Sequence, residues 1–189
     1  MDQQQSTPVI TNAEVYESDF YAWCLSTAQL VRTGQWEAID PEALAEELES
    51  LGKSQKRELE SRLEGLVMHL LKWAHQPGRR QESHSWYDTI REHRSQITFL
   101  LRDNPSLKPQ VAPLLAEVYP DARAWALGEM TSYTQGKRLQ QFRQFIQRGH
   151  LGQQGASGVD LEALGISPPP EQCPWTEAEI LAKEFWPGP

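Results

Sequence analysis

Four of the five histidines in this chain fall within one short stretch, HLLKWAHQPGRRQESHSWYDTIREHR, which covers residues 69–94. Histidine titrates near neutral pH and is the most frequent general acid, general base and metal ligand in proteins. Such a concentration raises the question of whether the stretch is an active site or the corner between two helices.

A polar seam leads into this stretch, with members three or four residues apart, which is the spacing of one helix face: Gln55, Glu58, Arg62, Gly65 and His69. A functional interpretation makes Glu58 and His69 an acid/base or ligand pair and Arg62 an anion clamp. His93 would complete the cleft. The alternative is a surface ion pair between Glu58 and Arg62, with His69 at the rim of the core and His93 as a hydrogen-bonded core residue. The alternative is the commoner outcome for such residues.

Other catalytic patterns are missing from the sequence. A carboxylate-bridged metal site in a helical bundle needs Glu-x-x-His pairs, and none occurs. We find no phosphate loop, dinucleotide-binding glycine pattern or nucleophile elbow. The sequence therefore favours a protein that is not an enzyme, and we expect no cofactor and no metal. Five charged residues are instead candidates for contact with a partner: Glu42, Glu46, Glu49, Arg79 and Arg80.

Apolar residues recur every three or four positions through most of the chain, which predicts an all-α protein, a compact helical bundle. The first helix is expected over residues 13–33, ended by Gly34. A long second helix starts at Pro41 behind the cap Asp40 and ends at Pro77. It is either one unbroken or bent helix, which we favour, or two helices joined near Gly52.

A third helix is expected to start with a capping box at Ser85 and Asp88 and to lie antiparallel to the second. Over 105–131 the helical spacing is interrupted by Pro113 and Pro120, which predicts a kinked helix or two short ones. A further helix follows from Gly136.

The tail has its own helix signal. Thr176 and Glu179 have capping-box spacing before two apolar residues, and aromatic residues surround this segment. We expect a disordered N-terminus over 1–12, a core domain over 13–149, and a linker and tail over 150–189 that dock on the core.

Charge is distributed unevenly. Residues 1–52 carry a net charge of −9, residues 53–102 carry +4 and residues 103–189 carry −3. An acidic chain is a poor general binder of nucleic acid, although the basic segment 72–102 keeps that class open as a third alternative. No apolar run is long enough to span a membrane. The two cysteines have no metal-ligand spacing, and the N-terminus lacks the pattern of a secretory signal, so we expect free thiols and a cytoplasmic protein.

Several ordered blocks resemble one known family: YESDFYAW at 16–23, LAEELESLGKS at 44–54, ELESRLEGLVMHLLKW at 58–73 and PSL at 105–107. They are similar to the bacterial family called domain of unknown function 29, which is abundant in cyanobacteria. The resemblance covers about residues 14–130, and CPWT and FWP in the tail extend it. It implies an all-helical bundle in a bacterial cytoplasm and brings no activity or cofactor. His93 departs from the family pattern, which more often has Gln there, and this speaks against a shared catalytic role.

The function predicted first is a non-enzymatic protein-interaction or regulatory module, for example an antitoxin-like neutraliser, because charge is segregated and catalytic motifs are missing. The alternative is an enzyme or small-ligand binder that uses Glu58, Arg62, His69 and His93 in a cleft. The sequence identifies neither the protein partner nor the oligomeric state, so a homo-oligomer stays open.

Overall fold

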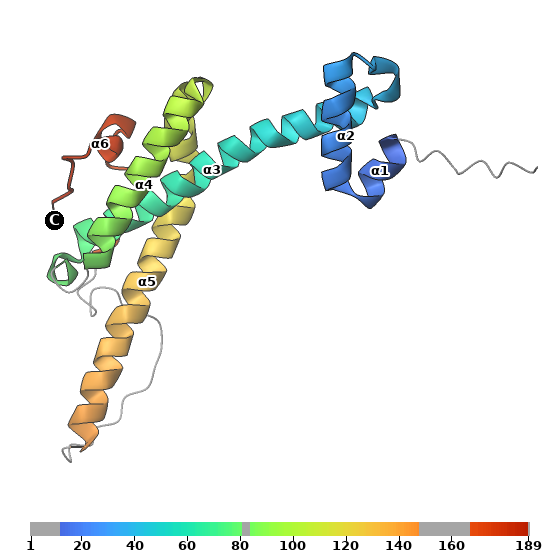
Figure 1. Ribbon diagram of the computed structural model, residues 1–189. Helices are drawn as coiled ribbons and strands as arrows, with labels where there is room; N and C mark the ends of the chain where they lie inside the picture. Colours follow the sequence, from blue (N-terminus) through green and yellow to red (C-terminus); the bar gives the residue numbers. More distant parts are fainter. Residues whose placement is uncertain (1–11, 81–83, 148–166, 189) are drawn as a thin grey trace, which may run out of the picture. The chain divides into compact units, whose positions relative to one another are not determined.

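The computed structural model describes residues 12–80, 84–147 and 167–188 of the 189-residue chain. Every regular element in these ranges is a helix (Figure 1). The prediction of an all-α protein is confirmed. The expected disorder over 1–12 and the expected linker from residue 150 lie, apart from Asn12, outside the described residues.

The helices form two compact units, which divide the chain between Ser54 and Gln55. We call residues 1–54 the N-terminal unit and residues 55–189 the C-terminal unit, and each is described by itself. Helix α3 (Pro41–His75) contributes its residues up to Ser54 to the first and the remainder to the second. This helix is continuous through Gly52, where the sequence left a bend open.

The N-terminal unit contains α1 (Asn12–Ser18), α2 (Phe20–Thr33) and the short helix η1 (Trp36–Ala38). The prediction of one helix over 13–33 is therefore wrong. The Asp19 carboxylate accepts a hydrogen bond from the Ala22 N–H at 2.9 Å, and this cap starts a new helix. As predicted, α2 ends at Gly34, whose left-handed φ of 71° lets the Gln35 N–H reach the Leu30 carbonyl at 3.0 Å.

A cluster of three aromatic side chains packs α1 against α2, and one of them also bonds to α3. Trp23 is buried and donates its Nε1–H to Asn12 Oδ1 at 2.9 Å. Its ring lies 4.8 Å from that of Tyr16 and 5.7 Å from that of Phe20. The Tyr16 hydroxyl donates to Glu47 Oε1 at 2.7 Å and so ties α1 to α3.

The start of α3 agrees with the sequence prediction. Asp40 Oδ1 accepts hydrogen bonds from the N–H groups of Glu42 at 3.1 Å and Ala43 at 3.2 Å. Pro41 occupies the first helical position, where its missing N–H removes no bond.

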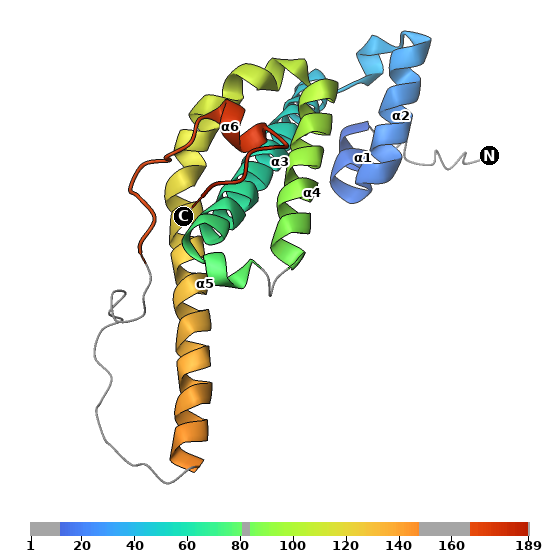
Figure 2. The same ribbon diagram turned by 90° about the vertical axis from the view of Figure 1, so that its left-hand side faces the viewer.

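The C-terminal unit adds η2 (Pro77–Arg79), α4 (His84–Asp103), η3 (Pro105–Gln110), α5 (Val111–Gln147) and α6 (Glu177–Leu181) to the rest of α3. Figure 2 shows α4 running back alongside α3, as the short connector requires. Helix α4 begins one residue before the predicted cap Ser85. The core is apolar and draws on four helices: Leu59, Leu63, Leu66, Leu70, Ile90, Ile97, Leu114, Tyr119, Ala122, Ala126, Met130 and Ile180.

Helix α5 joins two predicted segments into one helix. It continues through Pro120 and Gly136, so the separate helix expected from Gly136 is wrong, whereas a kinked helix, one of the two forms predicted over 105–131, remains compatible with the structure. Pro113 lies in the first turn, where helical N–H groups have no partner in any case. Pro120 removes one backbone hydrogen bond, but the neighbouring residues Tyr119 and Ala122 are buried in the core. Packing of this face therefore outweighs the lost bond.

Candidate functional site

The predicted polar seam on α3 includes an ion pair at its surface. Arg62 Nε donates to Glu58 Oε1 at 2.7 Å, and the two side chains are 34% and 49% exposed. A pair this accessible to water is worth at most about 1 kcal/mol. This geometry agrees with the second interpretation of the seam, in which Glu58 and Arg62 form a surface ion pair with each other.

The two predicted histidines lie close together, and both contact Gly65. His69 Nδ1 lies 2.8 Å from the Gly65 carbonyl oxygen. The His93 ring covers the same glycine from α4, because a Cβ on Gly65 would lie 2.7 Å from its Cε1 and Nε2 atoms. The two imidazole ring centroids are 6.0 Å apart. The close approach of α3 and α4 thus depends on a residue without a side chain.

Burial governs the protonation of both histidines. It lowers the pKa of His93, and the neighbouring His69 and the Arg62 cation lower it further, against the opposite effect of Glu92. Burial also lowers the pKa of His69, although its bond to the Gly65 carbonyl acts in the other direction. Both rings therefore favour the neutral form.

His93 Nδ1 is buried and has no hydrogen-bond partner among the described residues. Glu58, Arg62, His69 and His93 line none of the four cavities that are bordered by Trp186, by Leu48, by Tyr133 and by Cys173. A catalytic role for these four residues stays a prediction.

The basic residues at the end of α3 and in the connector that follows it contact groups of the C-terminal unit. Lys72 is 4% exposed, forms an ion pair with Glu129 of α5 and lies 5.1 Å from the ring centroid of Trp86. The Arg79 guanidinium lies between two rings, 4.6 Å from that of Trp86 and 3.4 Å from that of Tyr133. Arg79 also borders a cavity of about 480 Å³ beside Glu129 and Tyr133. These cations bind aromatic and acidic groups of the same unit.

Two arginines donate hydrogen bonds to backbone carbonyls of the tail, whose described residues are 167–188. Arg94 is 3% exposed; its Nε donates to the Ile180 carbonyl at 2.8 Å and its Nη2 to the Phe185 carbonyl at 2.7 Å. Arg80 donates to the carbonyls of Trp73 and Pro187. Burial lowers the pKa of Arg94, against the effect of the Glu184 carboxylate.

Further bonds position the beginning of the tail and α6. The Tyr119 hydroxyl donates to the Pro170 carbonyl at 2.6 Å, and Arg123 Nε donates to the Pro169 carbonyl at 2.9 Å. Thr176 and Glu179 form the predicted capping box at the start of α6. A second cavity, of about 630 Å³, lies beside Tyr119 and Cys173, and burial raises the pKa of this thiol.

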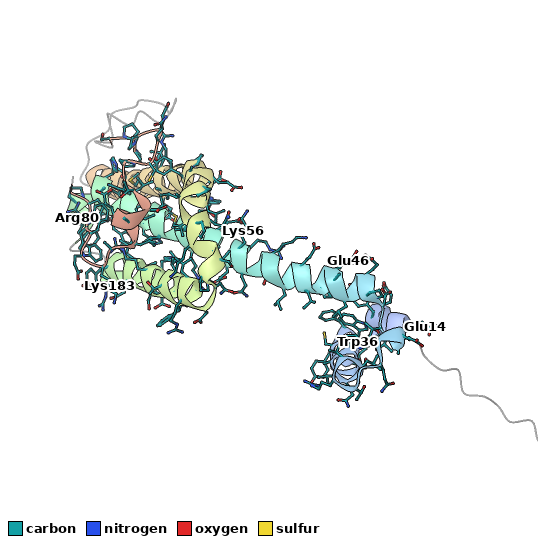
Figure 3. The ribbon with its side chains drawn as sticks, turned by 90° about the horizontal axis from the view of Figure 1, so that it is seen from above. Glu14, Trp36, Glu46, Lys56, Arg80 and Lys183 are labelled. Atoms are coloured by element: carbon teal, nitrogen blue, oxygen red, sulfur yellow. The ribbon has the colours of Figure 1, made fainter. Side chains whose placement is uncertain are left out.

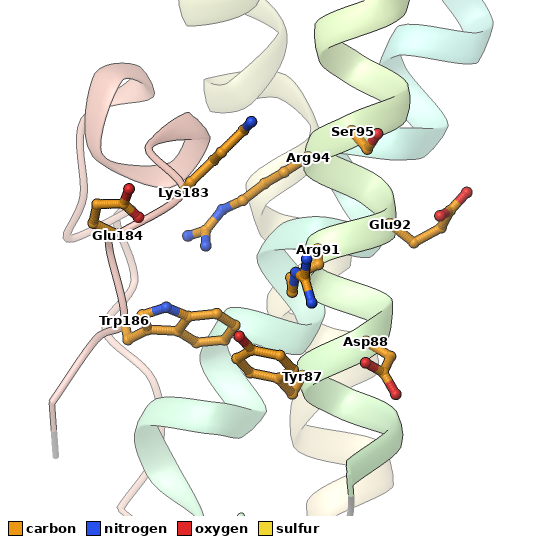
Figure 4. A pocket seen from close by; sticks show the side chains of 9 residues that line it. All are labelled: Tyr87, Asp88, Arg91, Glu92, Arg94, Ser95, Lys183, Glu184 and Trp186. Atoms are coloured by element: carbon orange, nitrogen blue, oxygen red, sulfur yellow. The ribbon is translucent and has the colours of Figure 1, made fainter.

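Trp186 of the tail packs against side chains of α3 and α4. Its ring is stacked on Tyr87 at 4.7 Å, lies 4.8 Å from Trp73, and is 5.2 Å from the Arg94 guanidinium. Figure 4 shows Trp186, Tyr87 and Arg94 at a cavity of about 650 Å³, with Arg94 extended from α4 toward the tail. The sequence places Arg94 among the basic residues near the connector but does not indicate that it binds the tail, because its partners lie more than 80 residues away.

The N-terminal unit carries an apolar groove of about 680 Å³ between α2 and the start of α3. Its lining is mainly apolar: Phe20, Trp23, Cys24, Thr27, Ala28, Val31, Arg32, Leu44, Glu47, Leu48, Ser50, Leu51 and Ser54. Phe20 is 50% exposed, Leu48 is 62% exposed and Leu51 is 63% exposed. The leucine seam of α3, buried from Leu59 onward, is thus open at its beginning.

Carboxylates surround Tyr16 beside this groove. The hydrogen bond to Glu47, together with burial and the charges of Glu47, Glu46 and Glu17, raises the pKa of Tyr16 to about 12. Of the predicted partner-binding residues, Glu42, Glu46 and Glu49 are exposed on α3, and Glu46 is labelled in Figure 3. Glu49 pairs with Lys53 at 2.9 Å.

Two features are absent from the described part of the chain: a cluster of metal ligands and a helix that could span a membrane. Within ranges 12–80, 84–147 and 167–188, no three His, Cys, Asp or Glu side chains are grouped to hold a metal ion. No helix in these ranges has the length and apolar character needed to cross a membrane.

The comparisons agree with the resemblance seen in the sequence. Neither a curated protein nor a solved structure matches the chain. One family, described as a domain of unknown function, DUF29, matches over residues 15–148, which include both the groove and the Gly65–His93 contact. The chain therefore belongs to the DUF29 family.

Proposed function

We propose that the protein is an interaction module whose N-terminal groove binds an amphipathic helix with basic flanking residues, supplied by a protein. The observation that supports this proposal is an open apolar groove within an acidic unit. Residues 12–54 contain nine acidic and two basic side chains, a net charge of −7. A helix in a hydrophobic groove is a common mode of peptide recognition.

The apolar lining can provide the binding energy. Full burial of a Leu or Phe side chain is worth about 1.5–3 kcal/mol. Because Phe20 is 50% exposed and Leu48 and Leu51 are 62% and 63% exposed, each has between about half and two thirds of this free energy left to gain. Binding also costs translational and conformational freedom. These quantities suit a micromolar rather than a nanomolar complex.

The negative charge at the groove can determine which helices bind there. The carboxylates of Glu17, Glu46 and Glu47 act together on Tyr16 at the groove. A cationic helix would be attracted by this charge and an anionic helix repelled. Arg32 is the basic member of the lining, so the attraction is expected to be strongest at the Tyr16 end.

A labelled peptide tests the proposal. An amphipathic Leu/Lys peptide of about 18 residues, which makes about five helical turns, is titrated with the full chain and followed by fluorescence anisotropy. We expect saturable binding that weakens severalfold between about 50 mM and 500 mM salt. The same peptide with Glu in place of Lys should not bind.

Groove variants make the test specific. Leu48→Ser combined with Leu51→Ser should weaken binding of the basic peptide at least tenfold. Leu25→Ser is the matched control, since Leu25 is 56% exposed on α2 but does not line the groove. Equal loss in the groove variant and the control, or no binding by the parent chain, would contradict the proposal.

The location and regulatory role belong to the same proposal. The partner would be another protein of a bacterial cytoplasm. If that partner is an enzyme or a toxin, occupation of the groove would neutralise it, which corresponds to the antitoxin-like role predicted from the sequence. Inhibition of the partner that is lost with Leu48→Ser and Leu51→Ser would support that role.

A further inference from the structure

A basic segment near the end of α5 has the composition expected of the groove's occupant. Between Glu129 and Asp160 the sequence has no acidic residue and four basic ones: Lys137, Arg138, Arg143 and Arg148. Helix α5 continues to Gln147. Within it, Leu139, Phe142 and Ile146 are spaced by three and four residues, the period of one helix face. The chain thus contains a basic helical segment with an amphipathic pattern.

The charge of the whole chain is divided in a matching way. The net charge of −8 belongs entirely to residues 1–54, and residues 55–189 are neutral overall, with 16 basic and 16 acidic side chains. The basic segment over 137–148 is therefore a local excess within a neutral unit. An acidic groove and a basic helix of the same chain are electrostatically complementary.

The apolar pattern of α3 indicates that its first part lacks a cover. Leu59, Leu63 and Leu66 have no exposed surface, whereas Leu48 and Leu51 are more than 60% exposed on the same helix. In the C-terminal unit this seam is covered by helices, including α5 as far as Met130. A helix is thus the kind of element that covers α3 where it is covered.

We infer that the N-terminal groove of one copy binds the basic segment 137–147 of α5 from a second copy, so that the chain self-associates. This inference rests on the proposed function, because it names the helix that the groove binds. Two copies that exchange the contact reciprocally form a closed dimer with twofold symmetry. Leu139, Phe142 and Ile146 would provide the apolar face, and Arg138 and Arg143 would meet the carboxylates at the Tyr16 end.

Sedimentation velocity of the full chain tests the inference over about 1–100 µM at low and high salt. We expect a monomer–dimer equilibrium that shifts toward monomer as salt rises. Arg138→Glu with Arg143→Glu should weaken dimerisation at least tenfold, and so should Leu48→Ser with Leu51→Ser. Leu25→Ser should leave it unchanged. Far-ultraviolet circular dichroism checks that each variant is folded.

A charge exchange identifies the pairing. Glu17→Lys with Glu46→Lys should weaken dimerisation alone and restore most of it when combined with Arg138→Glu and Arg143→Glu. The control is Glu117→Lys, an exposed carboxylate of α5, which should not restore it. A dimer insensitive to the α5 changes, or one that the exchange does not restore, overturns the inference.

The outcomes also separate this inference from the proposed function. A chain that stays monomeric at every concentration and still binds the Leu/Lys peptide overturns the second-copy inference and leaves the groove's function intact. A monomer that gains affinity for the peptide through Arg138→Glu and Arg143→Glu places the contact within one chain, which also overturns it. A monomer that does not bind the peptide overturns both.

Discussion

Gly65 of α3 lies directly beneath the imidazole of His93 of α4, so close that a Cβ on the glycine would stand 2.7 Å from two ring atoms. A side chain added there requires the His93 ring, or the helices that carry the two residues, to move. This contact, more than any proton transfer, accounts for the placement of His93 in the structure.

Gly65→Ala should therefore destabilise the protein. Overpacking typically costs about 1–3 kcal/mol, while the better helix propensity of alanine returns about 0.5–1 kcal/mol. We expect a net loss of about 1–2 kcal/mol in the free energy of unfolding, measured with urea.

Two variants serve as controls for this prediction. Gly52 lies in the same helix, and no atom is within 4 Å of a Cβ added to it. Gly52→Ala should therefore raise the free energy of unfolding by about 0.5–1 kcal/mol. His93→Ala should remove most of the extra cost of Gly65→Ala, since it deletes the ring. A Gly65→Ala protein as stable as the parent would contradict the packing seen here.

Stability should fall as pH falls below about 6.5, the ordinary pKa of histidine. Burial lowers the folded-state pKa of His93, so the unfolded chain binds the proton more readily. The stabilisation is complete above the unfolded pKa and is lost as pH falls through the folded one.

The groups that face His93 are His69 and Arg62 on α3 and Glu92 on its own helix. His93→Gln should reduce the loss of unfolding free energy between pH 7.5 and pH 5.5, values that bracket the ordinary pKa of about 6.5. His69 and His75, whose pKa values burial also lowers, remain in both proteins. Identical pH profiles of parent and variant would show that His93 does not contribute.

Arg94→Lys should loosen the tail. A lysine cannot reproduce the two bonds that the guanidinium makes to the Ile180 and Phe185 carbonyls, each worth about 1.5–3 kcal/mol as a charged hydrogen bond. Hydrogen exchange of the amides of α6 should accelerate, while those of α3 stay protected. Arg102→Lys is the control, because Arg102 is an exposed arginine of α4 that does not line the cavity beside the tail. Unchanged exchange in α6 would rule out Arg94 as the main tail contact.

The pair of Lys72 and Glu129 should respond asymmetrically to mutation. Glu129→Gln leaves the ammonium of Lys72 buried without a counter-charge and should cost about 1–3 kcal/mol. Lys72→Met replaces it with an apolar side chain of similar length and should cost less than about 1 kcal/mol. Glu117→Gln, on the exposed face of α5, should have no effect. Thermal unfolding measures the stability of the three variants. A larger loss of stability for Lys72→Met than for Glu129→Gln would contradict this account.

Local signals explain what the sequence could predict. Asp40, Gly34 and the pair Thr176–Glu179 act on backbone groups within a few residues, so the ends of α2, α3 and α6 could be foreseen. The repeat of leucines predicted α3 in the same way. The break at Asp19 is also local, but its cap competed with an apolar spacing that continued across it.

The remaining features depend on distant partners. Pro120 is tolerated because residues of other helices bury its neighbours in α5, and Arg94 is buried because the tail reaches it across 86 residues. Helical period likewise places Leu48 and Leu51 on one face without saying what covers them. Sequence reasoning therefore identified the residues of the polar seam but not the groove.

The 4.8 Å contact between Trp73 and Trp186 gives the docked tail an optical signature of its own. Two indoles this close couple their electronic transitions, so the near-ultraviolet circular dichroism of the protein should carry a band that depends on their mutual orientation. Disappearance of that band would report release of the tail while the rest of the C-terminal unit stays folded.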